Sequence, residues 1–134
     1  MIALDTNVLI YACDKADPVR QAAAIELISN STDGVIPWQV ACEFIAASRK
    51  LARQGFTSSD AWARLAEFLA ICRLVIPPGS AVLDRARELH LTRNVAFWDA
   101  MILASCLDVG VKVLYSEDVP GGDVEGLSIV NPFK

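Results

Sequence analysis

Short apolar runs alternate with longer helical segments along this chain, and this alternation restricts the possible folds more than any other feature. The runs that indicate strands are residues 2–4, 35–36, 74–76, 111–115 and 127–130. The segments with apolar residues at helical spacing are residues 18–28, 38–51, 59–72, 80–91 and 97–107. Strands separated by helices pair in parallel through crossover connections. The pattern therefore predicts a three-layer α/β domain.

The length and composition are those of one folded unit. The chain has 134 residues, of which 54% are hydrophobic and 21% charged, which is enough apolar material for a substantial core. No repeat or linker divides it, so we expect a single domain over 1–134. No run reaches the roughly 18 apolar residues of a membrane span, and no secretory leader precedes the first strand. We therefore expect a cytoplasmic protein that is not associated with a membrane.

Cysteine, histidine and net charge bear on the kind of site that the chain can carry. The four cysteines lie far apart without a C-x-x-C pair, and His90 is the only histidine, so neither a disulfide framework nor a zinc site is expected. The net charge of −4 argues against broad, non-specific binding to nucleic acid. It does not exclude a nucleic-acid enzyme, because a bound divalent cation inverts the sign of a carboxylate site.

The first charged residue, Asp5, directly follows the apolar run 2–4. That position is the carboxyl edge of the predicted parallel sheet, where ligand sites form in open α/β folds. Asp5 is equally suited to capping the helix that follows, by accepting a hydrogen bond from the backbone N–H of residue 7 or 8. The segment alone leaves both interpretations open.

Two further carboxylates interrupt apolar helix faces. Glu43 lies among Val40, Ala46 and Ala47, where a glutamate either belongs to a site or reaches past the boundary to water. Asp99 lies within VAFWDAMILASC, so that apolar periodicity runs through it. Its alternative role is to cap a helix that begins one residue later, but the periodicity favours a functional role.

A fourth carboxylate, Asp118, follows the apolar run 111–115, as Asp5 follows the first strand. A turn before Gly121 and Gly122 would also favour an aspartate there. Taken together, however, four clustered carboxylates would repel one another, and a Mg²⁺ or Mn²⁺ ion resolves that repulsion with oxygen ligands. Such an ion can activate water and stabilise charge on a phosphodiester. The pattern therefore indicates metal-dependent phosphoryl chemistry.

Five pieces of sequence resemble a known family in order and over essentially the whole chain. They are DTNVLIYA at 5–12, the helical Glu43, FWDAMILA at 97–104, LYSEDVPGG at 114–122 and LSIVNPF at 127–133. The chain resembles the PIN-domain ribonucleases, in particular the VapC-type toxins of bacterial and archaeal toxin–antitoxin pairs. The resemblance implies a three-layer α/β/α fold with a central, mostly parallel sheet flanked by helices.

The resemblance also implies an activity, partners and a set of site residues. The implied activity is Mg²⁺- or Mn²⁺-dependent endoribonuclease cleavage of single-stranded RNA by metal-activated water, which leaves a 5′-phosphate and a 3′-hydroxyl. The implied partners are a small antitoxin protein and a second copy of the chain in a homodimer. Asp5 and Asp99 would hold the metal, with Glu43 and Asp118 completing its ligands directly or through water.

The resemblance adds two polar residues beside the metal, Asn7 and Ser116. It favours Asp118 over the adjacent Glu117 as the fourth acid, because the family's usual order there is a hydroxyl residue, a variable residue and an acid. Whether Glu117 assists Asp118 or replaces it stays open at this point.

Two other function classes are compatible with parts of the pattern. A Mg²⁺-dependent phosphotransfer domain of the receiver or phosphatase type also combines aspartates with a parallel sheet. However, DTN lacks the second aspartate of a D-x-D signature, and VKVLYSED has no lysine at its strand end to hold an acyl phosphate. A non-catalytic RNA- or protein-binding domain is disfavoured by the complete set of acids.

An RNA surface would need positive charge. The candidates are Arg49, Lys50 and Arg53 after the Glu43 helix and Arg85, Arg87 and Arg93 before Asp99. Solvated helix faces usually carry such charges as well, so the residues alone do not assign the RNA contacts. Trp38 and Trp98 are expected in the core rather than stacked on bases, because tryptophan in an apolar element is usually buried.

Overall fold

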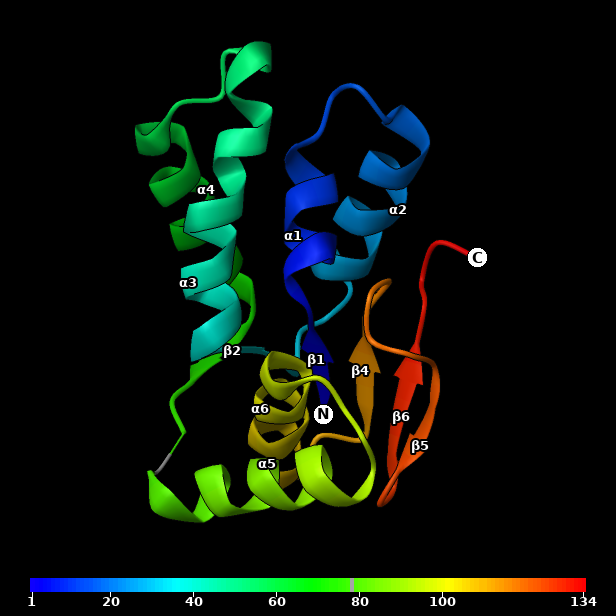
Figure 1. Ribbon diagram of the computed structural model, residues 1–134. Helices are drawn as coiled ribbons and strands as arrows, with labels where there is room; N and C mark the ends of the chain where they lie inside the picture. The colour runs from blue at the N-terminus through cyan, green and yellow to red at the C-terminus, as the bar shows by residue number, and fades with distance from the viewer. Residues whose placement is uncertain (78) are drawn as a thin grey trace.

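The computed structural model describes residues 1–77 and 79–134 and contains a six-stranded sheet in the order β3-β2-β1-β4-β6-β5 (Figure 1). The strands are β1 (Ile2–Leu4), β2 (Gly34–Pro37), β3 (Arg73–Val75), β4 (Val113–Tyr115), β5 (Gly122–Val124) and β6 (Leu127–Val130). All neighbouring strands pair in parallel except β5, which runs antiparallel to β6. The predicted mostly parallel sheet is therefore confirmed.

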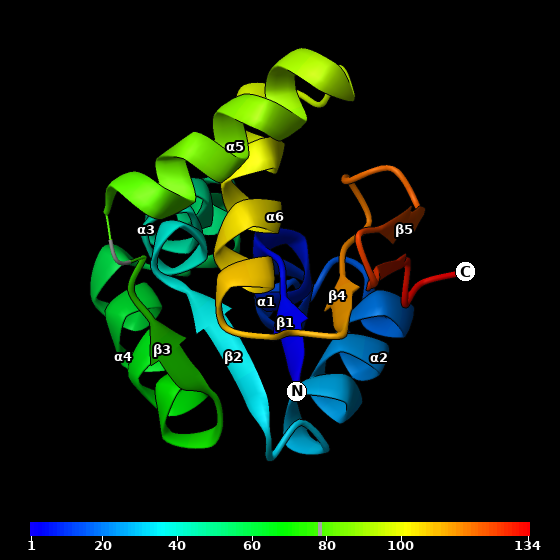
Figure 2. The ribbon, with the colours of Figure 1, turned by 90° about the horizontal axis from the view of Figure 1, so that it is seen from below.

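Helices cover both faces of this sheet. They are α1 (Thr6–Cys13), α2 (Pro18–Ser29), α3 (Trp38–Ala47), α4 (Ser58–Ile71), α5 (Ser80–Thr92) and α6 (Phe97–Asp108). The chain moves from β1 to β2 and β3 in one direction through α1 to α4, and then returns to β4 through α5 and α6. Because such crossovers are right-handed, the change of direction places the two sets of helices on opposite faces, as Figure 2 shows. The predicted three-layer α/β/α fold is confirmed.

Local signals explain where the helices begin. Asp17 caps α2 by accepting a hydrogen bond from the backbone N–H of Arg20, and Pro18 occupies the first helical position. Thr57 and Asp60 form a capping box at the start of α4, in which each side chain accepts a hydrogen bond from the other residue's backbone N–H. The helix predicted over 59–72 therefore begins one residue earlier, at Ser58.

The core lies between the central strands and their helices. Leu4, Ile36 and Leu114, one from each of β1, β2 and β4, are completely buried. Phe44 of α3 and Phe68 of α4 pack edge to face with ring centroids 5.6 Å apart. This packing holds α3, which carries Glu43, against the sheet.

Several boundaries differ from the sequence-based prediction. The helix predicted over 38–51 ends at Ala47, and a 3-10 helix (Ser48–Gln54) continues to Gly55, whose φ of 79° closes the segment. The run 111–115 enters the sheet only at Val113. The antiparallel strand β5 was not predicted, because its sequence GDV is short and begins with glycine.

Some side chains also lie elsewhere than predicted. Trp38 and Trp98 are 51% and 64% exposed, so the expectation that both belong to the core was wrong. Cys42 is exposed, whereas the other three cysteines are buried and reduced. Pro78, in the Pro77-Pro78-Gly79 stretch that follows the predicted strand 74–76, lies outside the described residues. Among the residues described, no helix combines the length and hydrophobicity that crossing a bilayer requires.

Candidate active site

The carboxyl ends of β1 and β4 form the point at which the strand order reverses, where ligands bind in open α/β sheets. Asp5 directly follows β1, and Ser116 directly follows β4. The backbone N–H of Asp5 donates to the carbonyl of Tyr115 at 3.0 Å, which extends the pairing of the two strands by one residue. Residues from the two ends of the chain therefore meet at this edge.

The Asp5 carboxylate is held on both oxygens and is only 4% exposed as a residue. Its Oδ1 accepts a hydrogen bond of 2.7 Å from the backbone N–H of Thr6, and its Oδ2 accepts one of 2.6 Å from the hydroxyl of Ser116. Asp5 is thus the N-cap of α1, through Thr6 rather than through residue 7 or 8 as predicted. Burial raises the pKa of Asp5, and these hydrogen bonds oppose that rise.

Ser116 connects Asp5 to the loop that carries the fourth acid. Its hydroxyl oxygen accepts hydrogen bonds from the backbone N–H groups of Asp118 at 3.2 Å and Val119 at 3.0 Å. Its own backbone N–H donates to the carbonyl of Val130 at 2.9 Å. Ser116 is 1% exposed, so these contacts are shielded from water.

Glu43 is oriented by two side chains. The hydroxyl of Thr6 donates to Oε2 at 2.9 Å, and the amide of Gln39 donates to Oε1 at 2.6 Å. The same Gln39 amide also donates to the carbonyl of Trp98 at 3.1 Å, which links α3 to the start of α6. The sequence analysis assigned no role to Thr6 or Gln39. The spacing of Gln39 four residues before Glu43 was a usable signal, because such pairs are neighbours on a helix.

Asn7 distinguishes the two adjacent acids of the β4 loop. Its amide nitrogen donates to Oδ2 of Asp118 at 3.2 Å, and its amide oxygen accepts from the backbone N–H of Glu117 at the same distance. Asn7 therefore contacts the carboxylate of Asp118 but only the backbone of Glu117.

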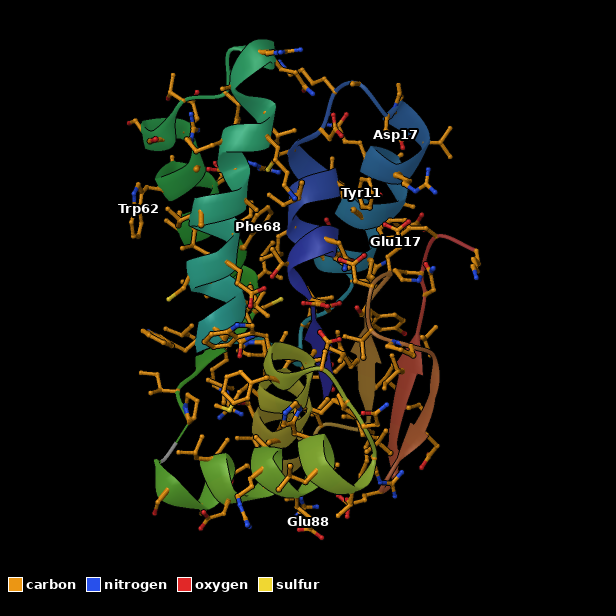
Figure 3. The ribbon with its side chains drawn as sticks, in the orientation of Figure 1. Tyr11, Asp17, Trp62, Phe68, Glu88 and Glu117 are labelled. Atoms are coloured by element: carbon orange, nitrogen blue, oxygen red, sulfur yellow. The ribbon has the colours of Figure 1, made fainter. Side chains whose placement is uncertain are left out.

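The Glu117 carboxylate instead lies towards α1 and α2 (Figure 3). It is 3.6 Å from the guanidinium of Arg20. Its hydrogen bond, together with burial and its charge, raises the pKa of Tyr11 to about 12. Glu117 thus makes its contacts outside the acidic group.

Asp99 is the third residue of α6, and Ala96 is the N-cap, so the alternative in which Asp99 caps a later helix was wrong. Within the described part of the chain, no hydrogen bond to its carboxylate is present. Burial raises the pKa of Asp99 most, and the charges of Asp118 and Glu43 raise it further. The charges of Glu43 and Asp118 also raise the pKa of Asp5. Glu43 and Asp118 are therefore near enough to Asp5 and to Asp99 for their charges to act on both.

A groove of about 790 Å³ opens beside this group and runs between α1 and the α3–3-10 segment. Glu43 and Asp118 line it together with Thr6 and Asn7. Lys50 lines the same groove, so a cation shares it with these acids.

The donor set suits a hard divalent cation. The four acids offer carboxylate oxygens, which Mg²⁺ and Mn²⁺ prefer over nitrogen or sulfur. Over residues 1–77 and 79–134, no three acidic, cysteine or histidine residues are gathered closely enough to enclose an ion by themselves. Mg²⁺ commonly binds through only one or two carboxylates and keeps several waters. The residues present fit an ion bound in that way.

Comparison with known proteins supports the same architecture. A model of the PIN domain matches residues 2–119. No curated protein matches the chain.

Among solved structures, the VapC20 toxin of Mycobacterium tuberculosis, described as cleaving the sarcin–ricin loop, is similar over 88% of this chain and 90% of its own, with 20% identity and a TM-score of 0.69. VapBC2 of Rickettsia felis, bound to promoter DNA, has 17% identity, 98% coverage of both chains and a TM-score of 0.67. A toxin–antitoxin complex of Klebsiella pneumoniae has 18% identity with the same coverage and TM-score. These likenesses show the fold.

Proposed function

Because this chain belongs to the PIN-domain family, we propose that it is a Mg²⁺- or Mn²⁺-dependent endoribonuclease. The observation that supports this most is the grouping of Asp5, Glu43, Asp99 and Asp118 at one sheet edge. They come from four separate segments. The pKa values of Asp5 and Asp99 are raised, so keeping these two carboxylates charged lowers the stability of the folded state. Perturbed carboxyls gathered at a ligand-binding edge are typical of a functional site.

Asp5 and Asp99 would hold the ion, and Glu43 and Asp118 would complete its ligands directly or through water. When bound, the ion supplies an activated water and stabilises charge on the phosphodiester. Each oxygen of Asp5 already accepts one hydrogen bond, and each keeps a further lone pair for a ligand contact. Among the described residues, neither oxygen of the Asp99 carboxylate accepts a hydrogen bond, so both are available to a ligand contact.

The chain's own polar residues hold these acids in place before substrate arrives. Ser116 orients Asp5, Asn7 orients Asp118, and Thr6 with Gln39 orients Glu43. A carboxylate that is already oriented loses little side-chain entropy on binding an ion, so these contacts favour both affinity and a defined geometry.

We further propose that the protein is the toxin of a toxin–antitoxin pair, with an antitoxin protein as its partner and a homodimer as its assembly. The similarity in fold to a toxin described as cleaving the sarcin–ricin loop and to two toxin–antitoxin assemblies supports this. RNA is the substrate class favoured by the same comparison.

The test is incubation of the purified protein with a panel of single-stranded and structured RNAs in Mg²⁺, in Mn²⁺ and in EDTA. We expect cleavage with either ion, loss of cleavage in EDTA, and loss in Asp5→Asn. Asp108→Asn, at the exposed opposite end of α6 from Asp99, is the matched control and should cleave normally. Cleavage that persists in EDTA would contradict the proposal. Stable phosphorylation by a small phosphodonor, without cleavage, would replace it with phosphotransfer.

A further inference from the structure

A second hollow borders the acids at α6. It has a volume of about 480 Å³, and Asp99 lies on its lining. The groove and this pocket therefore flank the acidic group, with Glu43 and Asp118 lining the groove and Asp99 lining the pocket. We name this hollow the Asp99 pocket. A substrate that reaches the acids through the groove would meet the pocket next.

The floor of the Asp99 pocket is apolar. Leu103, Val119 and Ile129 line it from α6, the β4 loop and β6, and each is at most 6% exposed. On the side of β5 the lining includes Gly121 and Gly122, which present no side chain, together with Asp123 and the partly buried Val124. The floor of the pocket is therefore buried and apolar, which suits a flat aromatic ring.

The rim of the pocket carries polar groups. Asn94 adopts the left-handed conformation, with φ of 56°, which asparagine tolerates better than most residues. Asp123 also lines the pocket and accepts a hydrogen bond of 3.0 Å from the backbone N–H of Gly126. An amide and a carboxylate above an apolar floor offer both donors and acceptors to the edge of a nucleobase.

Only one of the cations before Asp99 lines this pocket. Arg85 is paired with Glu125 at 3.0 Å, and Arg87 is exposed on α5 away from the lining. Arg93 lines the pocket, and among the described residues its side chain makes neither an ion pair nor a hydrogen bond. A guanidinium so placed is available to a phosphate.

We propose that the Asp99 pocket binds one nucleobase of the RNA substrate beside the scissile phosphate, and that Arg93 contacts a neighbouring phosphate. This inference rests on the proposed ribonuclease function and adds to it a site that selects the base. Discrimination comes from the shape of the pocket and from Asn94 and Asp123. The overall attraction comes from Arg93.

The first test fills the pocket. Ala96 lines it, is exposed, and caps α6 without a side-chain hydrogen bond, so Ala96→Trp removes no buried contact. Ala66→Trp on the exposed side of α4 is the matched control. Each change is placed in the Asp5→Asn protein, and binding of short single-stranded RNAs, varied one base at a time, is followed by fluorescence anisotropy.

We expect Asp5→Asn to prefer one base at one position by about 10-fold, the scale of one hydrogen bond between the rim of the pocket and the edge of the base. Ala96→Trp should abolish this preference, and Ala66→Trp should keep it. If the preference survives Ala96→Trp, or is lost equally in Ala66→Trp, the proposal that the pocket binds the base is wrong. If the base preference depends on the pocket but the wild-type protein does not cleave RNA, the proposed nuclease function is wrong and the proposed base-binding pocket stands. The absence of any RNA binding overturns both.

The second test concerns the phosphate contact. Arg93→Ala should weaken binding of all the RNAs alike and reduce the slope of log affinity against log salt by about 1. Arg87→Ala, the same change at an exposed arginine outside the pocket lining, should leave the slope unaltered. An unaltered slope in Arg93→Ala, or equal reductions in both variants, overturns the role of Arg93.

Discussion

The hydroxyl of Ser116 donates a hydrogen bond of 2.6 Å to the carboxylate of Asp5, although 111 residues separate the two in sequence. The bond joins the carboxyl ends of β1 and β4, the strands at which the order of the sheet reverses. Because the same hydroxyl oxygen accepts two backbone N–H groups of the loop that carries Asp118, it sets the positions of two acids at once.

Ser116→Ala should therefore impair cleavage more than it impairs folding. It removes the donor to Asp5 and the acceptor of the loop, and we expect a loss of about 10- to 100-fold in kcat/KM, the range for residues that orient metal ligands. The free energy of unfolding should fall by about 1–3 kcal/mol, because buried partners are left unsatisfied. Steady-state cleavage and urea denaturation measure the two quantities.

Ser105→Ala is the control for that experiment. Ser105 is equally buried, but its hydroxyl donates only to the carbonyl of Met101 within α6. Its replacement should leave kcat/KM unchanged. Equal losses of activity in both variants would show that Ser116 acts through general stability rather than through Asp5.

Asp99→Asn should abolish cleavage and stabilise the fold. We expect an activity loss of more than about 100-fold, as when one charged or donor group is removed from a catalytic site. Burial and two neighbouring carboxylates raise the folded-state pKa of Asp99 above 3.8. The folded protein therefore binds this proton more tightly than the unfolded chain does, and its stability falls as the pH rises through that raised pKa.

The melting temperature of Asp99→Asn should accordingly exceed that of wild type at pH 7. The difference should vanish well below pH 3.8, where Asp99 is protonated in both the folded and the unfolded wild-type chain. Thermal denaturation without divalent ions, as a function of pH, measures this. Asp108→Asn should lack the pH-dependent difference, since it lies at the far end of α6. A melting temperature below that of wild type at pH 7 would disprove mutual repulsion among the acids.

Much of the fold was predictable because parallel crossovers leave a strong periodic signal. The runs before Asp5 and before Ser116 predicted β1 and β4, and the alternation of strands with helices predicted parallel pairing through crossovers. The strand β5 escaped prediction because pairing with β6, rather than its own sequence, makes it a strand. Trp38 and Trp98 were assigned to the core because periodicity marks a helix face as apolar without telling what covers it.

The four candidate acids could be selected from the sequence, but most of the contacts that orient them could not. Asp5, Glu43, Asp99 and Asp118 each stood out because a charge interrupted an apolar pattern or followed a strand. The i,i+4 spacing of Gln39 and Glu43 is visible within α3, whereas the contacts of Thr6 with Glu43 and of Gln39 with Trp98 arise only when α1, α3 and α6 meet. Such contacts depend on three-dimensional packing, which a single sequence does not display.

Added Mg²⁺ should stabilise the wild-type protein. An ion that binds only the folded state adds about 2.7 kcal/mol when its concentration is 100 times Kd. We expect a rise in melting temperature that saturates with Mg²⁺, little or no rise in Asp5→Asn, and reversal by EDTA. An equal rise in wild type and Asp5→Asn would mean that the ion binds elsewhere. Because the readout is thermal, it is independent of any RNA substrate.

Replacement of Glu117 and Asp118, one at a time, should separate two neighbouring carboxylates with different tasks. Asp118→Asn removes a charge that acts on both Asp5 and Asp99, and cleavage should fall by more than about 100-fold. Glu117→Gln weakens a partly exposed pair with Arg20, which costs about 0–1 kcal/mol and should leave cleavage within a few-fold of wild type.

The Glu117→Gln variant also carries a spectroscopic signal. The hydrogen bond and charge of Glu117 raise the pKa of Tyr11 to about 12, so their loss should lower it towards 10.0. Absorbance titration in a Tyr115→Phe background, where Tyr11 is the remaining tyrosine, reports this shift. A lowered Tyr11 pKa with cleavage retained would assign Glu117 to the junction of α1 and α2. A loss of cleavage as large as that in Asp118→Asn would instead make Glu117 a member of the acidic site.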